Sequence, residues 1–145
     1  MNISVDIFEP VLSFGIVAEK IDISVQTIRF YEQKGLILPY KTKTGQRLYS
    51  FHDLYRLQCI RKMITEHGIN MAGIIHLISL IPCWEYKGSL DEECKKCPAY
   101  FEAVEPCWNI KEVGSKCRNA DCRNCPVYHL DITSEELKNI IFKHS

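Results

Sequence analysis

Apolar residues recur at helical spacing in two short stretches near the start of the chain, with a tight link between them. The first stretch, residues 14–21, is amphipathic, and Ser13 can cap its N-terminus. The second stretch begins after Ser24, which can cap it in the same way, and ends before Gly35, which suits a left-handed position. Two short helices joined like this form either an ordinary helical hairpin or a helix-turn-helix, whose second helix enters the major groove of DNA.

A short hairpin is predicted directly after these helices. Pro39 favours extended backbone, and Thr44 and Gly45 supply a turn between two short strands. From residue 24 to residue 50 the only acid is Glu32, and it faces five basic residues: Arg29, Lys34, Lys41, Lys43 and Arg47. A helix with a basic hairpin beside it suits a DNA groove flanked by phosphates.

Three further helices are predicted from capping signals and apolar spacing. Ser50 can cap the first of them, which carries Cys59 on a stripe where a small buried thiol is the simplest interpretation. Asn70 can cap the second, and Pro82 stops it. The third is a C-terminal amphipathic helix that begins with a capping box at Thr133. Because about ten residues are too few for a stable isolated helix, its apolar stripe should dock on the same chain or on a partner subunit. The members of that stripe are Ile132, Leu137, Ile140 and Ile141.

Four sequence signatures occur together at one spacing between the second helix and the end of the hairpin. They are residues 27–32 (TIRFYE), residues 35–37 (GLI), Pro39, and residues 45–50 (GQRLYS). In this combination residues 11–81 resemble the winged helix-turn-helix of the MerR family. The resemblance implies a bacterial transcription regulator that binds double-stranded DNA as a homodimer, at a near-palindromic promoter site, with RNA polymerase as an indirect partner.

The resemblance also implies roles for individual residues. Those matching Arg29 and Tyr31 on the second helix, and Arg47 and Tyr49 on the wing, contact the DNA backbone in that family. Further DNA contacts are expected from Ser24, Thr27 and Lys41. Of these, Thr27 and its helical neighbours should lie nearest base edges, whereas Lys41 should hold a phosphate.

The chain departs from the family in three places. Lys41 stands where arginine is common, which keeps the charge but loses the bidentate fork, and Gln46 replaces a frequent wing tyrosine. The third departure is larger. Metal and drug sensors of the family continue with a long dimerisation helix, but this chain turns after Ile81 into a segment of cysteine, proline and glycine. Dimer contacts are therefore expected from the cysteine segment or from the C-terminal helix.

The predicted fold is mainly α. It comprises a winged helix-turn-helix domain with a small β-hairpin wing (residues 11–81), a small cysteine-rich, metal-stapled module (82–130) and a short C-terminal amphipathic helix (131–145). A chain of 145 residues can hold two small domains if the second is stapled. The formal net charge is zero, but it divides into 9 − 7 = +2 through Ile81 and 9 − 11 = −2 from Pro82 onward. DNA binding should therefore depend on placed contacts and dimerisation more than on a broad basic field.

Neither a signal peptide nor an apolar run long enough to span a membrane is recognisable, so a cytoplasmic protein without membrane contact is expected. Eight cysteines in such a chain indicate metal or redox chemistry before structural disulfides.

Most of these cysteines lie in a duplicated segment between Pro82 and Tyr128. Each unit reads P-C-W…C-x-x-C-P-x-Y, which resembles small cysteine-tryptophan modules appended to bacterial signalling proteins. A C-x-x-C turn directs two thiolates at one point, and a distant cysteine closes the site. The second unit offers four thiolates by itself: Cys107, Cys117, Cys122 and Cys125. The first offers three, Cys83, Cys94 and Cys97, and a set shared between the units, with Cys107 completing the first, is the alternative.

The residues leave the cofactor open between zinc and an iron–sulfur cluster, since both accept four thiolates, with thiol redox sensing as a third interpretation. We expect a DNA-binding regulator whose cysteine module senses redox state or metal, and not an enzyme. The main alternative is a regulator whose module is a purely structural zinc or protein-interaction domain. A thiol oxidoreductase is a weaker alternative, because no thioredoxin-like context surrounds either C-x-x-C.

Overall fold

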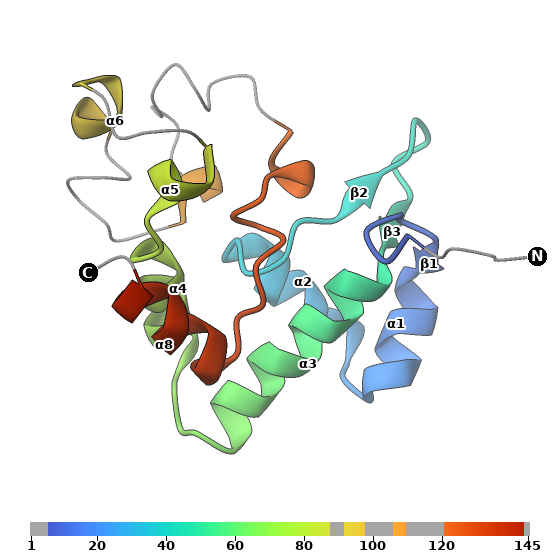
Figure 1. Cartoon of the computed structure of the whole chain (residues 1–145). Helices are drawn as coiled ribbons and strands as arrows, with labels where there is room; N and C mark the ends of the chain where they lie inside the picture. Colours follow the sequence, from blue (N-terminus) through green and yellow to red (C-terminus); the bar gives the residue numbers. More distant parts are fainter. Residues whose placement is uncertain (1–5, 88–91, 98–105, 110–120, 144–145) are drawn as a thin grey trace, which may run out of the picture. The chain divides into compact units, whose positions relative to one another are not determined.

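The computed structural model describes residues 6–87, 92–97, 106–109 and 121–143 (Figure 1). The chain divides into two compact units, residues 1–59 and 60–145, and the boundary falls inside one continuous helix, α3. Each unit is considered by itself below. Among the helices described, none combines the length and the apolarity that a membrane crossing requires.

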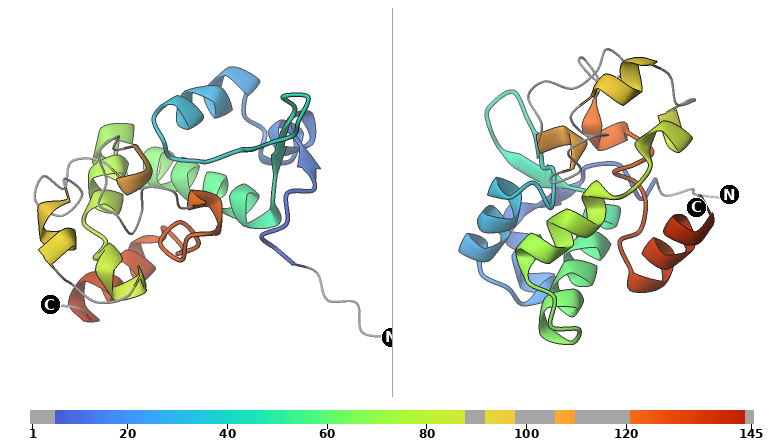
Figure 2. Two further views of the ribbon diagram at one scale, coloured as in Figure 1. Left: turned by 90° about the horizontal axis from the view of Figure 1, so that it is seen from above. Right: turned by 90° about the vertical axis from the view of Figure 1, so that its left-hand side faces the viewer.

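The first unit combines a helix pair with a three-stranded antiparallel sheet in the order β1-β3-β2, whose first strand precedes the helices. Figure 2 shows α1 and α2 as neighbouring helices, in blue and light blue. The elements are β1 (Leu12–Ser13), α1 (Phe14–Ile21), α2 (Val25–Gln33), β2 (Tyr40–Lys41), β3 (Arg47–Tyr49) and α3 (Phe51–Thr65). The core under these elements is formed by Val17, Ile28, Leu36, Ile37 and Leu57, all fully buried.

Capping fixes where the two helices begin and end, as the sequence predicts. The Ser13 side chain accepts a hydrogen bond from the Ile16 N–H, and that of Ser24 accepts one from the Thr27 N–H at 3.1 Å. Beyond α2, Gly35 has φ of 78°, a backbone region that favours glycine. The Leu36 N–H then bonds back to the Tyr31 carbonyl at 3.0 Å and closes the helix.

The wing is the hairpin of β2 and β3. Lys41 pairs with Arg47 across the ladder, and the turn is closed by a hydrogen bond of 2.9 Å from the Gly45 N–H to the Thr42 carbonyl. Gly45 has φ of 86°, which explains the glycine in the predicted Thr-Gly turn. The wing is held on its other side by β1, where Leu12 lies opposite Tyr49.

Helix α3 begins with a reciprocal cap and carries a buried arginine. The Asp53 carboxylate accepts from the Ser50 N–H at 2.8 Å, and the Ser50 hydroxyl accepts from the Asp53 N–H at 3.0 Å. Arg56, only 2 % exposed, donates from Nε to the Leu36 carbonyl at 2.7 Å. This bond ties the exit of α2 to α3. Cys59 is buried on the same helix, as the sequence predicts.

The second unit is built from short helices. They are α4 (Met71–Ser79), α5 (Cys83–Lys87), α6 (Glu92–Lys96), the 3₁₀ turns η1 (Cys107–Asn109) and η2 (Cys122–Asn124), and α8 (Ser134–Lys143). Asn70 caps α4 by accepting from the Gly73 N–H at 2.8 Å, and Thr133 caps α8 through the Glu136 N–H at 3.1 Å. Both caps are predicted by the sequence.

The apolar stripe of α8 is buried within the chain itself. Ile132, Leu137 and Ile140 are each less than 5 % exposed. Of the two possibilities left by the sequence, docking on the same chain is therefore the one observed for these three side chains. The side chain of Ile141, the fourth member of the predicted stripe, lies outside the described part of the chain, so a contribution of α8 to dimer contacts stays a prediction.

The fold class agrees with the prediction of a mainly α winged helix-turn-helix: the described residues are mainly helical and include a small antiparallel sheet. The metal-stapled character of the cysteine-rich segment stays a prediction. The three-part division predicted from the sequence, with boundaries at 81 and 130, stays a prediction.

Candidate nucleic-acid interface

A groove of about 350 Å³ lies on the first unit where the helix pair meets the wing. Three separate pieces of the chain line it: the start of α1, one residue of α2, and the tip of the wing. The lining residues are Ser13, Phe14, Gly15, Arg29, Gly45, Gln46 and Arg47. The structure thus brings together Arg29 and Arg47, two predicted phosphate ligands that are eighteen positions apart in the sequence.

The start of α1 adds a third source of positive potential to this groove. The first backbone N–H groups of a helix lack partners within the helix, and the helix dipole places partial positive charge there. Ser13 caps one of these groups, and Phe14 and Gly15 follow it in the lining of the groove. An anionic group is therefore favoured by two guanidinium groups and by a helix N-terminus. Sequence reasoning identified Ser13 only as a cap and did not assign this part of the chain to the interface.

Arg29 is exposed on α2 and is steadied by an aromatic ring. Its guanidinium carbon lies 5.9 Å from the centroid of the Phe14 ring. A cation over an aromatic face is attracted by the ring quadrupole, which orients the side chain without neutralising its charge. Arg29 thus stays available to an anion in the groove.

Glu32 holds the wing against α2. Its Oε2 accepts from Arg47 Nε at 2.9 Å, and its Oε1 accepts from the Tyr49 hydroxyl. The Glu32 side chain is 9 % exposed and that of Arg47 is 32 % exposed, so the ion pair is partly shielded from water. The single acid of this basic region therefore fixes the position of the wing, a role that sequence reasoning did not assign to it.

Tyr49 is a positioning residue in this structure. It is fully buried, and burial, followed by the hydrogen bond and charge of Glu32, raises the pKa of Tyr49 well above its ordinary value. The phenol therefore remains protonated and continues to donate to Glu32. Its hydroxyl faces the helix, and a direct phosphate contact by Tyr49, expected from the family resemblance, stays a prediction.

Of the other predicted DNA-contact residues, some are exposed and others are buried or in contact with a neighbouring side chain. Lys41 and Ser24 are exposed, while Tyr31 is buried, with 6 % exposure. Thr27 is half-buried, and its hydroxyl is 2.8 Å from that of Ser24. The α2 side chains that point to solvent beside Thr27 are Val25, Gln26, Arg29, Phe30 and Gln33.

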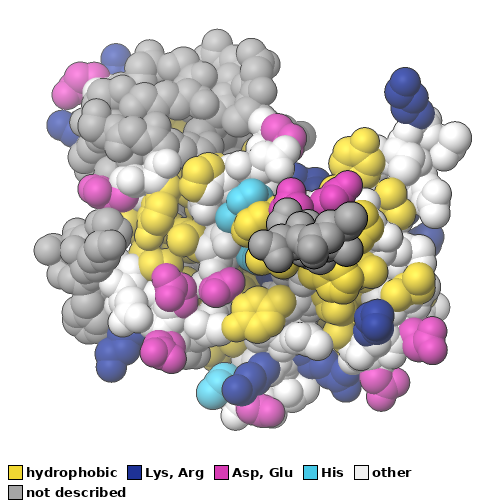
Figure 3. Space-filling view, turned by 45° about the vertical axis from the view of Figure 1, so that its right-hand side comes forward, with side chains coloured by type: hydrophobic (Ala, Val, Ile, Leu, Met, Phe, Trp, Pro, Cys, Tyr) yellow, Lys and Arg dark blue, Asp and Glu magenta, His cyan; other side chains and the backbone are white. Residues whose placement is uncertain are grey.

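Basic and acidic side chains are mixed on one face of the protein. Among the described residues on the face shown in Figure 3, Lys and Arg are interspersed with Asp and Glu. This distribution agrees with a binding mode based on a few placed contacts.

We expect Glu32→Gln to weaken DNA binding even though it removes a negative charge from the interface. If Glu32 acted only by its charge, the substitution would tighten binding and steepen its salt dependence. Because Glu32 holds Arg47 and Tyr49, we expect instead a loss of roughly tenfold in affinity, the scale of one charge-assisted hydrogen bond. Fluorescence anisotropy with labelled duplex DNA measures the change, and Glu19→Gln, an exposed acid on α1, is the matched control. Tighter DNA binding by Glu32→Gln would contradict the role of Glu32 in holding Arg47 and Tyr49.

The cysteines of the second unit are only partly within the described residues. Cys83, Cys97, Cys107 and Cys122 are half-buried and Cys125 is buried. Cys117 and the side chain of Cys94 lie outside the described part. Across the ranges given above, no three His, Cys, Asp or Glu side chains form a group that could hold a metal ion. The predicted four-thiolate set of the second repeat therefore stays a prediction, because one of its members is not described.

The sequence of this DNA-binding region matches a known protein family. Residues 12–80 match the family described as MerR HTH family regulatory protein. Residues 12–80 are a MerR-family helix-turn-helix domain. This agrees with the resemblance seen in the helix and wing signatures. The matched residues include the whole lining of the groove and the contacts of Glu32 with Arg47 and Tyr49.

Several relatives are named transcriptional regulators. The HTH-type transcriptional regulator GlnR of Bacillus anthracis is 40 % identical over 65 residues, which are 45 % of this chain and 50 % of the relative. The HTH-type transcriptional regulator TnrA of Bacillus subtilis is 43 % identical over 65 residues, or 45 % of this chain and 58 % of the relative. The chain thus spans about half the length of these curated relatives, which are regulators and not enzymes.

One relative matches over a longer stretch. The Heavy metal-dependent transcription regulator 1 of Rhizobium meliloti is 28 % identical over 115 residues, which are 72 % of this chain and 76 % of the relative. That share is larger than the MerR-family domain can supply, so this similarity extends beyond residues 12–80.

Proposed function

We propose that this protein is a one-component transcription regulator that binds promoter DNA through its MerR-family domain and responds through its cysteine-rich segment. The DNA-binding part of this proposal rests on the groove in which Arg29, Arg47 and the N-terminus of α1 converge. Its size and charge suit a phosphate of the DNA backbone, and the exposed face of α2 lies beside it on the same unit. The named relatives, which are transcriptional regulators, support the same conclusion.

In this proposal the groove sets the register of the protein on DNA, and α2 reads sequence. Phosphates at Arg29, Arg47 and Lys41 position the domain but carry no sequence information. Gln26 and Thr27, on or beside the exposed face of α2, carry hydrogen-bonding groups that suit base edges. The wing, fixed by Glu32, carries Arg47 to the flanking backbone.

A homodimer on a near-palindromic site completes the proposal. Two copies related by two-fold symmetry would place two α2 helices in successive major grooves, about 34–36 Å apart or a multiple of that distance. DNA distortion between the half-sites would then contribute to specificity. The predicted sources of the dimer contacts are the cysteine-rich segment and α8.

Selection of bound duplexes from a random pool by the full chain tests the DNA-binding proposal. We expect an enriched site made of two inverted half-sites, and a dimer mass by light scattering of the complex. Failure to enrich any sequence, together with a monomer mass, would contradict it.

For the cysteine-rich segment we propose a thiolate-bound metal or iron–sulfur cluster that reports metal or redox state to the DNA-binding domain. The predicted ligands are Cys107, Cys117, Cys122 and Cys125, with Cys83, Cys94 and Cys97 as further candidates. The extended similarity to a relative named as a heavy metal-dependent regulator supports a response of this kind. Metal and acid-labile sulfide, measured per chain on protein purified without oxygen, test it. DNA affinity that is identical with and without the bound group would favour a purely structural module.

A further inference from the structure

The two cysteine repeats begin with the same local structure. In the first repeat the Glu85 N–H donates to the Pro82 carbonyl at 3.0 Å, and in the second the Asn109 N–H donates to the Pro106 carbonyl at 2.9 Å. Each Pro-Cys-Trp signature therefore starts a helical turn, α5 or η1, with the cysteine as its first residue. The two repeats thus share this turn-closing hydrogen bond, although α5 is an α-helix and η1 a 3₁₀ turn.

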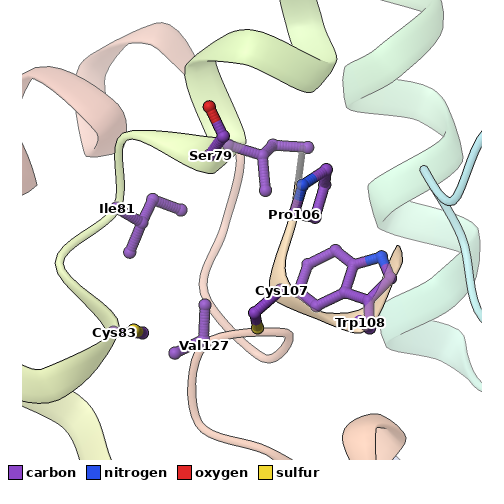
Figure 4. Close-up of a pocket in the computed structure, with 8 residues that line it drawn as sticks. Ser79, Ile81, Cys83, Pro106, Cys107, Trp108 and Val127 are labelled. Carbon is purple, nitrogen blue, oxygen red and sulfur yellow. The ribbon is translucent and has the colours of Figure 1, made fainter. Parts of the chain in front are cut away.

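These equivalent cysteines open onto one pocket of the second unit. Cys83 and Cys107 both line it, together with Ile78, Ser79, Ile81, Pro106, Trp108 and Val127. Figure 4 shows Cys83 and Cys107 on separate segments at the same cavity, with the Val127 side chain near both. Both thiols are half-buried, which leaves each of them partly accessible to solvent.

The walls of this pocket come from the motifs themselves. Val127 belongs to the Cys-Pro-Val-Tyr run of the second repeat and is 4 % exposed. The neighbouring Tyr128 packs edge-on against Trp108, with ring centroids 5.5 Å apart at 86°. The tryptophan that follows Cys107 is thus held in place by the tyrosine that follows the C-x-x-C. A packed apolar wall of this kind limits the access of water and competing ligands to the thiols.

The chemistry of the two thiols indicates which ligand the pocket would hold. Its cavity volume is about 10 Å³, the space of about one water molecule. Thiolates are the ligands preferred by soft or borderline cations such as Zn²⁺.

We propose that Cys83 and Cys107 are two ligands of one mononuclear thiolate site, shared between the repeats and occupied by a single thiophilic cation of the Zn²⁺ class. The proposal rests on the proposed function of the cysteine-rich segment and specifies which repeats supply its ligands. Binding links α5 to η1 through the metal, so the metal joins the first repeat to the second. Each thiol releases its proton when its sulfur coordinates the cation, which makes the affinity fall with decreasing pH.

Co²⁺ titration of the full chain without oxygen tests this assignment. The wild type should bind one Co²⁺ per chain with the absorption of a tetrahedral thiolate site, and Zn²⁺ should displace it. Cys83→Ser and Cys107→Ser should each weaken binding by at least tenfold and remove part of the sulfur-to-cobalt charge-transfer absorption. The double variant should bind more weakly than either single variant and should lose the charge-transfer absorption of both thiolates, because the two residues belong to one site. Cys59→Ser, a thiol of α3 outside the repeats, is the matched control.

A second measurement does not depend on the folding of any variant. Wild-type protein is alkylated with and without Zn²⁺, and the modified cysteines are identified by mass spectrometry. Zn²⁺ should protect Cys83 and Cys107 at the same metal concentration. Protection of Cys107 alone, or unchanged binding by Cys83→Ser, would overturn the shared site while leaving a metal-binding module in place. A wild type that binds no Co²⁺ and no Zn²⁺ would overturn both the shared site and the metal proposal, but not DNA binding.

Discussion

Arg29→Ala and Arg47→Ala should each weaken DNA binding by roughly ten- to hundredfold, and should do so for every duplex tested. The physical reason is the groove: each substitution would remove a charge-assisted hydrogen bond to a phosphate, worth about 1.5–3 kcal/mol. Phosphate contacts carry no sequence information, so specific and non-specific affinities should fall together. The slope of log affinity against log salt concentration should become less steep by about 0.9 for each phosphate that the variant no longer neutralises.

The matched control is Lys20→Ala, which removes one positive charge from the last turn of α1, at the end of the helix away from Ser13. Its affinity and salt slope should stay close to those of the wild type. The Arg47 variant also loses the ion pair with Glu32, so its deficit should exceed that of the Arg29 variant. Salt titrations by fluorescence anisotropy measure all three proteins. Unchanged affinity and slope for both arginine variants would exclude the groove as the phosphate site.

Cys122→Ala should empty the metal site of the cysteine-rich segment and unfold that segment. A small module with little apolar sequence needs a staple, and a structural metal contributes on the order of 10 kcal/mol or more to folding in comparable small domains. Metal per chain should fall below detection, with acid-labile sulfide and visible absorption lost as well if the group is a cluster. The only two tryptophans of the chain, Trp84 and Trp108, both lie in this segment, so intrinsic tryptophan fluorescence reports on its folding alone.

Cys59→Ala is the comparison for this variant, because it removes a buried thiol from α3 without touching either repeat. It should keep the wild-type metal content and tryptophan spectrum. The DNA affinity of Cys122→Ala shows whether DNA binding by the first unit requires a folded cysteine-rich segment. Full metal content in Cys122→Ala would mean that the C-x-x-C of the second repeat does not supply a ligand.

The elements of the first unit were determined by local sequence. Ser13 and Ser24 cap their helices because a serine oxygen satisfies a free N–H within three residues. Gly35 and Gly45 occupy left-handed positions because a side chain is disfavoured there. These are short-range effects, so caps, turns and the helix-turn-helix signature could be predicted from residue types and spacing alone. The same applies to Thr133, which starts α8 where the capping box predicts it.

Tertiary structure decided which side chains act together. Glu32 and Arg47 are fifteen positions apart, and only the pairing of β2 with β3 beside α2 brings the carboxylate to the wing. The same arrangement buries the Tyr49 hydroxyl against Glu32, a contact that local sequence did not predict. The start of α1 joins the groove for the same reason. Local pattern indicates residue type and element, but not the partner that a long-range contact supplies.

The cysteine-rich segment shows the same division most clearly. Sequence determined that Pro82 to Tyr128 is a duplication and that its cysteines are spaced for ligand chemistry. Counting thiolates within one repeat favoured Cys107 with Cys117, Cys122 and Cys125. The fold adds that Cys107 and Cys83, the equivalent cysteines of the two repeats, line one pocket with Trp108 and Val127. The four-thiolate set of the second repeat stays a prediction, because Cys117 lies outside the described residues. Spacing along the chain limits which ligands can share a turn, whereas the packing of one repeat on the other selects which cysteines share a cavity.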